Sequence, residues 1–134
     1  MTNIQNISLN RITFHEVAHA STGGPALAKT QVISDKNSFS SFFDGNAPRI
    51  DLGNIKGIVV GISLGQRPTS GYGVKICSVS QPTDGIAAGL MEIECQEIKP
   101  RGAALQVITH PYVIVAVEGT QWLTDVVVRW INES

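Results

Sequence analysis

The chain lacks the residues that would place it in several common classes of protein. Its 134 residues include only two cysteines, Cys77 and Cys95, too few for a disulfide scaffold or a structural zinc site. Ten basic and eleven acidic residues leave a net charge of −1, so no overall field attracts nucleic acid or an anionic membrane. No apolar run reaches the roughly 18 residues of a membrane-spanning helix, and no signal peptide is visible. We therefore expect no nucleic-acid partner and no membrane span, and the compartment and the oligomeric state stay open.

Leucine is also scarce, and the residues that replace it favour strands. The sequence has 7 Leu against 28 Ile and Val, and 9 Thr bring the β-branched residues to more than a quarter of the chain. Side chains branched at Cβ suit a pleated sheet better than a helix. We predict a single, mainly β domain over residues 1–134, built as an antiparallel sheet, a sandwich or a partly open barrel around one core.

Alternation and turn residues locate the expected elements. One short helix is predicted at about residues 35–44, where Ser34 or Asp35 can cap it and three phenylalanines fall on one face. The segment 57–65 is apolar throughout and bounded by glycines, as in a central strand buried on both faces. A turn is expected at Asp84-Gly85. The predicted strands are residues 6–20, 28–33, 57–65, 72–79, 90–98, 105–109, 112–117 and 123–131.

The two cysteines lie on strands that we expect to form a hairpin. Matching the apolar faces of these strands pairs Ile76 with Ile93 and Lys75 with Glu94. Cys77 then points away from Cys95, so we predict no disulfide and a Cys95 that acts as a small core residue.

The pentad His15-Glu16-Val17-Ala18-His19 matches H-E-x-x-H, the zinc peptidase pattern. On a helix it would place both imidazoles on one face and Glu16 beside a metal-bound water. Its neighbours favour a strand, however, and alternation along a strand would hold the two histidines on one face about 13 Å apart, too far to share a zinc ion. Zinc hydrolysis is therefore the weakest alternative, and we expect neither a metal nor any other cofactor.

Other catalytic patterns are weaker still. Ser70 lies in a loop that His110 could approach, but no nucleophile-elbow motif surrounds it and no motif places an aspartate. No glycine cluster opens a helix to cradle phosphate. We therefore expect no enzymatic activity.

The most informative segment follows the apolar run 57–65. Residues 66–73 combine a rigid proline, flexible glycines, a guanidinium and an aromatic ring, a mixture typical of recognition loops. A structural corner explains the same residues equally well, because Tyr72 can bury its ring under the end of the sheet.

The chain resembles a known family in this region. The resemblance spans residues 50–118 and rests on Ile50-Asp51-Leu52, the run GIVVGISLGQRPTSGYGVKI, the turn Pro100-Arg101-Gly102 and the segment Thr109 to Val115. These residues are similar to the C-terminal domain of the protease complex subunit PrcB family. Upstream, ITFHEVAHASTGGPALAKTQVISDKNSFSSFF is similar to the opening strands and helix of the family, which implies that the HEVAH pentad lies on a strand. Ser70 and His110 depart from the residues usual in the family.

The resemblance implies a non-catalytic subunit that binds and stabilises an exported protease. A second likeness supports an alternative function, because residues 67–72 are similar at four of six places to the Asn-Pro-Thr-Thr-Gly-Tyr loop of chagasin-type cysteine protease inhibitors. In either case the partner is a protein. The residues predicted to bind it are Arg67, Pro68, Thr69, Ser70, Gly71, Tyr72, His110, Pro111 and Tyr112.

Overall fold

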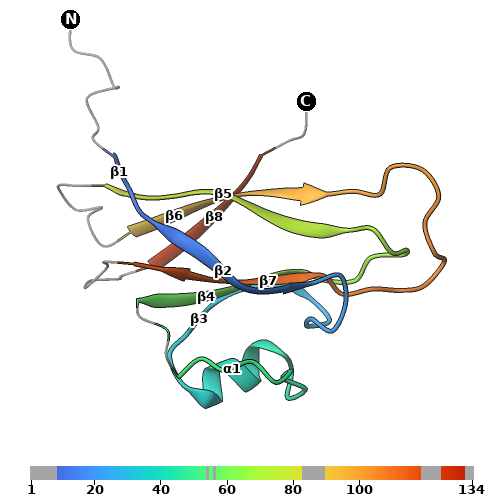
Figure 1. The fold of residues 1–134 in the computed structure, drawn as a ribbon, viewed down its shortest axis with the longest axis horizontal. Coiled ribbons are helices and arrows are strands. Elements are labelled where there is room, and N and C mark those ends of the chain that lie inside the picture. Colours follow the sequence, from blue (N-terminus) through green and yellow to red (C-terminus); the bar gives the residue numbers. More distant parts are fainter. Residues whose placement is uncertain (1–8, 54, 56, 83–89, 119–124, 132–134) are drawn as a thin grey trace, which may run out of the picture.

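A computed structural model describes residues 9–53, 55, 57–82, 90–118 and 125–131. The chain folds into two stacked four-stranded sheets, with one helix against the outer face of the lower sheet (Figure 1). Sheet A has the strand order β1-β5-β6-β8, and sheet B has the order β2-β7-β4-β3. The elements are β1 (Leu9–Arg11), β2 (Phe14–Ala20), β3 (Ala28–Ile33), α1 (Lys36–Phe42), β4 (Ile58–Leu64), β5 (Gly73–Pro82), β6 (Leu90–Ile98), β7 (Tyr112–Val117) and β8 (Asp125–Ile131).

This architecture confirms the mainly β prediction and, in the part of the chain that the structure describes, selects the sandwich over the barrel. Among the described residues, no helix is long and apolar enough to cross a membrane.

The first predicted strand is two strands that belong to different sheets. After β1 the chain crosses from sheet A to sheet B, and the crossing is anchored at both ends by the backbone. The amide of Ile12 donates to Val79 O at 2.9 Å, and the carbonyl of Thr13 accepts from the amide of Glu118 at 3.0 Å. The crossing closes one side of the sandwich. On the opposite side the edge strands β3 and β8 pack against each other.

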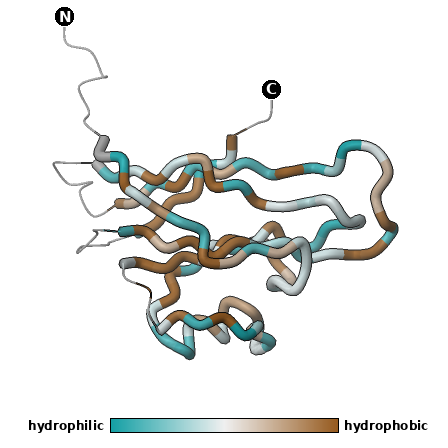
Figure 2. The backbone as a smooth tube through the Cα atoms, in the orientation of Figure 1, coloured by the Kyte–Doolittle hydropathy of each residue, from teal (hydrophilic) through white to brown (hydrophobic). Residues whose placement is uncertain are grey.

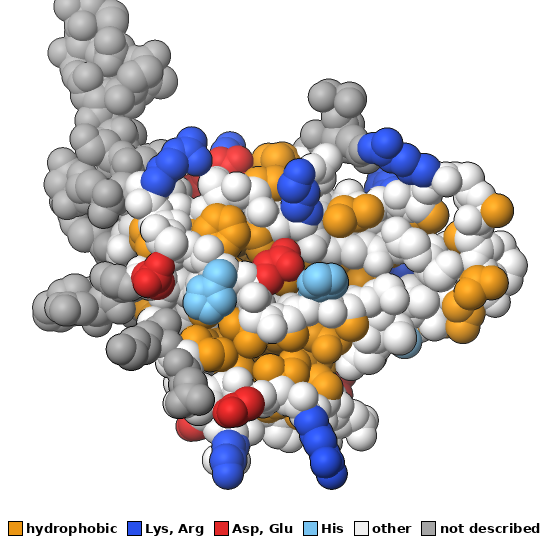
Figure 3. Space-filling model, viewed as in Figure 1, with side chains coloured by type: hydrophobic (Ala, Val, Ile, Leu, Met, Phe, Trp, Pro, Cys, Tyr) orange, Lys and Arg blue, Asp and Glu red, His pale blue; other side chains and the backbone are white. Residues whose placement is uncertain are grey.

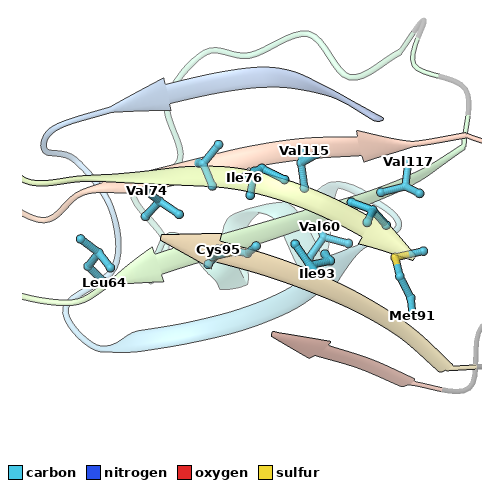
Figure 4. Close-up of a cluster of buried hydrophobic side chains, with 12 residues drawn as sticks. Val60, Leu64, Val74, Ile76, Met91, Ile93, Cys95, Val115 and Val117 are labelled. Atoms are coloured by element: carbon cyan, nitrogen blue, oxygen red, sulfur yellow. The ribbon is translucent and has the colours of Figure 1, made fainter. Parts of the chain in front are cut away.

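The two middle strands of sheet B are covered on both faces. Every residue of β7 is buried, and so is every residue of β4 after Ile58. This confirms the predicted central strand, and it explains the largely hydrophobic colour of these strands in Figure 2. The core between the sheets, shown in Figure 4, contains Val60, Ile62, Leu64, Val74, Ile76, Val79, Met91, Ile93, Cys95, Val113, Val115 and Val117. A second cluster under α1 contains Ile33, Phe42, Phe43, Val59, Tyr112, Ile114 and Ala116.

The helix begins after one of the two caps that the sequence predicts and ends two residues before the predicted limit. Asp35 is the N-cap, and its carboxylate accepts from the amide of Ser38 at 2.8 Å while the Ser38 hydroxyl accepts from the amide of Asp35 at 3.0 Å. This reciprocal capping box lowers the pKa of Asp35, because hydrogen bonds from Ser38 favour the ionised carboxylate. Beyond the helix, Asp44 and Gly45 both adopt positive φ and stop it.

The predicted register of the β5–β6 hairpin is wrong. Ile76 lies opposite Cys95 rather than Ile93, and Lys75 lies opposite Gln96 rather than Glu94. A β-bulge between Ile76 and Ser78 leaves Cys77 without a directly opposed residue. Alternation alone could not locate this extra residue, because a bulge shifts the pairing without changing the composition of either strand.

Two further predictions about the strands need correction. Residues 105–109 form no strand, and only Thr109 makes an isolated bridge, to Arg67. Strand β8 pairs with β6 in parallel, so sheet A is mixed rather than purely antiparallel, and the two arrows point the same way in Figure 4. The turn predicted at Asp84-Gly85 lies outside the described residues.

The two free thiols should react very differently in the native protein. Burial, helped by the nearby Cys77, raises the pKa of Cys95 from 9.0 to about 12, so its nucleophilic thiolate is absent at neutral pH. A thiol reagent at pH 8 should label the half-buried Cys77 alone, and should label both cysteines in denaturant. Because the unfolded thiol ionises first as the pH rises, the free energy of unfolding should fall between pH 9.0 and about 12 and recover fully below this range. Labelling of both thiols before unfolding, measured by mass spectrometry, would contradict this assignment.

Candidate functional site

Two long loops meet at one end of the sandwich, on the right in Figure 1. The β4–β5 loop comprises residues 65–72, and the β6–β7 loop comprises residues 99–111. Their backbones exchange two hydrogen bonds between Arg67 and Thr109, at 2.8 and 2.9 Å. The structure therefore brings the predicted binding loop beside the segment that contains His110.

Arg67 holds the β4–β5 loop against the sheet. Its guanidinium makes a bidentate pair with Glu97 of β6, with Nε to Oε2 at 2.9 Å and Nη2 to Oε1 at 3.1 Å. Its Nη1 also donates to the carbonyl oxygens of Leu64 and Gln66, both at 3.0 Å. The guanidinium lies 5.8 Å from the centre of the Tyr72 ring, a cation–π distance. Hydrogen bonding to Glu97 raises the pKa of Arg67, so this side chain stays charged and engaged within the domain.

Further contacts attach the β6–β7 loop to its neighbour. The Ser70 amide donates to Leu105 O at 3.1 Å, and the Ser70 hydroxyl accepts from the Leu105 amide at 2.9 Å. The Thr109 hydroxyl donates to Thr69 O at 2.9 Å. Gly71 has a φ of +95°, and a Cβ there would stand 2.6 Å from Cβ of Pro100, so close packing of the two loops requires glycine.

The nine predicted binding residues divide by exposure. Pro68 and Gly71 are exposed, whereas Pro111 and Tyr112 are buried and cannot present their side chains to a partner. Tyr112 packs edge-on against Phe43 with ring centroids 4.9 Å apart, and burial raises the pKa of its phenol. The remaining five, Arg67, Thr69, Ser70, Tyr72 and His110, are half-buried.

His110 joins a third segment to this end. Its carbonyl accepts from the amide of Gly24 at 2.8 Å, and its amide donates to the Thr22 hydroxyl at 3.3 Å. The β2–β3 turn is therefore anchored beside the other two loops.

The large apolar side chains that are exposed at this end were not predicted as a site. Leu105, Val107 and Ile108 of the β6–β7 loop are 71%, 49% and 57% exposed, and Leu27 of the β2–β3 turn is 76% exposed. Figures 2 and 3 show hydrophobic colour at this end of the molecule. Sequence reasoning missed these residues because the β-branched run Val107-Ile108-Thr109 favoured a strand, and a strand would have turned alternate side chains into the sheet.

The HEVAH pentad lies on β2, as the resemblance implied, and not on a helix. A bulge between Glu16 and Ala18 shifts its register with β7. His15 is opposite Ala116 of the cluster under α1, whereas His19 is opposite Val113 of the core between the sheets. The two histidines therefore lie on opposite faces of sheet B, which corrects the expectation that they share a face. His19 Nδ1 instead pairs with Glu16 Oε2 at 3.2 Å.

The fold and its joined loops define a β-sandwich domain with one preorganised end. Residues 58–118, which run from β4 to the residue after β7, match the family model described as PrcB C-terminal, so this part of the chain is similar to the PrcB C-terminal family. The match bears out the family resemblance and begins eight residues later than the resemblance noted at residue 50. No curated protein and no solved structure gave a significant match.

Proposed function

We propose that the chain is a non-catalytic subunit that binds a protein, and by its family a protease, through the aliphatic side chains of the β6–β7 loop. The observation that carries this proposal is the exposure of Leu105, Val107 and Ile108 on a loop that hydrogen bonds hold in place. Exposed apolar side chains grouped on one loop are typical of protein interfaces.

The attachment of this loop matters as much as its composition. A flexible loop would lose conformational entropy on binding, and that loss would weaken the complex. Here the backbone at both ends of the aliphatic segment is already bonded to the β4–β5 loop, at Ser70 and at Arg67. The surface is therefore ordered before a partner arrives.

Within the predicted site, the structure favours different roles for different residues. Pro68 and Gly71 are exposed beside the aliphatic side chains and could touch a partner. Arg67, Thr69 and Ser70 make contacts inside the domain, so we assign them to positioning the loops.

The double variant Leu105→Asp/Ile108→Asp tests this function. Capture of the partner from an extract of the native cell, followed by mass spectrometry, should fall by more than about tenfold, because a central apolar contact is lost and charge is buried in its place. The temperature of unfolding should stay unchanged, since both side chains are exposed. Thr30→Asp, which adds one negative charge at an exposed position of β3, is the control for added charge and should capture the partner normally.

Equal capture by the double variant and the parent would overturn the proposal. The alternative function, inhibition of a cysteine protease, is tested with the same proteins by adding the parent protein to a papain-like protease. Inhibition that is lost in Pro68→Ala but retained in Leu105→Asp/Ile108→Asp would favour the alternative.

A further inference from the structure

The four edges of the two sheets differ in how well they are protected from pairing with another strand. Strand β1 has three residues, and β2 is interrupted by its bulge. Both lie on the side of the sandwich that the chain crossing closes. Short and bulged edges do not recruit further strands.

Strand β8 has none of these protections. Its seven residues pair with β6 without a register shift, from Asp125 opposite Leu90 to Ile131 opposite Gln96. It is the last strand of sheet A among the described residues, so its outer edge carries backbone donors and acceptors that no described strand pairs. A long regular edge of this kind is a template for another strand.

The two faces of β8 have different surroundings. Val126 and Val128 pack against the core between the sheets, whereas Asp125, Val127 and Arg129 are exposed on the other face. Apolar surface also remains beside this edge, because Val127 is 41% and Trp130 is 43% exposed.

The charges on the outer face of β8 are complementary to those of a second β8 that runs antiparallel to it. A second β8 that runs antiparallel, with its core face on the same side, must pair odd-numbered residues with odd-numbered residues. When Val127 lies opposite its own copy on a two-fold axis, Asp125 of each strand lies opposite Arg129 of the other. A shift of two residues in either direction places Asp125 opposite Val127 or Ile131 and loses both charge pairs.

These charges are accessible for such pairing. Arg129 bonds to Glu94 at 2.9 Å and approaches Glu92 at 3.3 Å, yet its side chain remains 60% exposed. Asp125 accepts a hydrogen bond from the amide of Val126 at 2.8 Å and has no cationic partner among the described residues. We propose that β8 pairs antiparallel with β8 of a second copy of this chain, centred on Val127, and so joins two A sheets into one continuous sheet.

The other open edge does not offer the same complementarity. Strand β3 carries one charged residue, Lys29, whose ammonium bonds to Ser41 O at 2.9 Å and to Asp44 at 3.4 Å beside α1. A second β3 therefore finds no pair of opposite charges to set its register.

Charge exchange at β8 tests the pairing. Sedimentation velocity over a range of concentrations should show a dimer of the parent protein. Asp125→Arg and Arg129→Asp should each weaken it by about tenfold or more, because two attractive pairs become two repulsive ones. An equimolar mixture of the two single variants should form a heterodimer, and the double variant Asp125→Arg/Arg129→Asp should dimerise again.

Controls separate the interface from folding. Thr30→Arg on β3 should dimerise like the parent, and thermal unfolding should confirm that each variant is folded. A parent that is monomeric at every concentration would overturn the proposal. So would weakening by Arg129→Asp alone without rescue in the mixture, because that result would reflect only the lost bonds to Glu92 and Glu94.

A cysteine at the two-fold axis provides an independent measure of register. Val127→Cys should cross-link to a covalent dimer under mild oxidation, since residues directly opposite in an antiparallel pair have Cβ atoms about 4.5–5.5 Å apart. Val126→Cys, one residue away and facing the core, should not. Equal cross-linking of both variants would contradict the proposed register.

Discussion

Replacing Phe42 by alanine should lower the free energy of unfolding by about 3–5 kcal/mol, the usual cost of removing a fully buried aromatic ring. Phe42 is 0% exposed on α1 and packs edge-on against Phe43 with ring centroids 4.9 Å apart. The loss should therefore detach the helix from sheet B. Urea denaturation monitored by circular dichroism measures the effect, and Phe39→Ala, at a half-buried position of the same helix, should cost less.

The position of the Phe42 ring also explains a glycine in the middle of a buried strand. A Cβ at Gly61 of β4 would stand 2.9 Å from Cε1 and Cζ of Phe42. Gly61→Ala should therefore cost about 1–3 kcal/mol in the parent through overpacking. In the Phe42→Ala background the added methyl meets no ring, and the cost should disappear. Strictly additive effects in this double-mutant cycle would show that the Phe42 ring is not the reason why position 61 requires glycine.

Arg67→Ala should lower the free energy of unfolding by about 2–3 kcal/mol, which is large for a loop residue. The change leaves the half-buried carboxylate of Glu97 without its cation and removes the donor to the carbonyls of Leu64 and Gln66. The free energy of unfolding can be measured by denaturant titration. Arg67→Lys should recover only part of the loss, because one ammonium cannot reproduce the bidentate geometry.

The same variant distinguishes a contact residue from a positioning residue. If Arg67 acts on the partner only by holding the loops, Arg67→Ala and Glu97→Gln should weaken capture to a similar degree, with similar losses of stability. Strong loss of capture by Arg67→Ala with unchanged stability would instead place Arg67 in direct contact with the partner.

Much of the fold can be predicted from local sequence patterns, because the spacing of apolar residues indicates which side chains are buried. The first and last residues of β3, β6 and β7 coincide with those of the predicted segments, since each strand has turn residues at its ends. The helix cap at Asp35 was predictable because capping depends on a few adjacent residues. The pairing of β8 was not, since whether a strand pairs parallel or antiparallel depends on the path of the chain between sheets.

The bulges show a second limit of sequence reasoning. At Cys77 and near Val17 one extra residue reverses which side chains face the core, and nothing in the alternation of Phe14 to Ala20 marks the change. The bulge in β2 decides the meaning of the HEVAH pentad, because it separates His15 from His19 across the sheet. A motif read as a string of letters contains no information about this separation.

The composition of residues 66–72 suggested a candidate site, but it did not indicate the structural roles of the individual residues. Residues 66–72 lie at the end of the sandwich where three loops meet. The residue types that suggested recognition, Arg67 and Tyr72, instead stack on each other and anchor the loop. The exposed Leu105 and Ile108 escaped notice because exposure depends on the loop path, which the sequence does not reveal.

The chain crossing between β1 and β2 limits how many copies can join. Because it closes the side of the sandwich that carries β1 and β2, an assembly through β8 would use the long regular edge of both members, and the β3 edge that remains has no opposite charges to set a register. Association would therefore end at a discrete pair related by a two-fold axis rather than grow into a fibre. A domain rich in β-branched residues can in this way offer an open sheet edge and still avoid unlimited polymerisation.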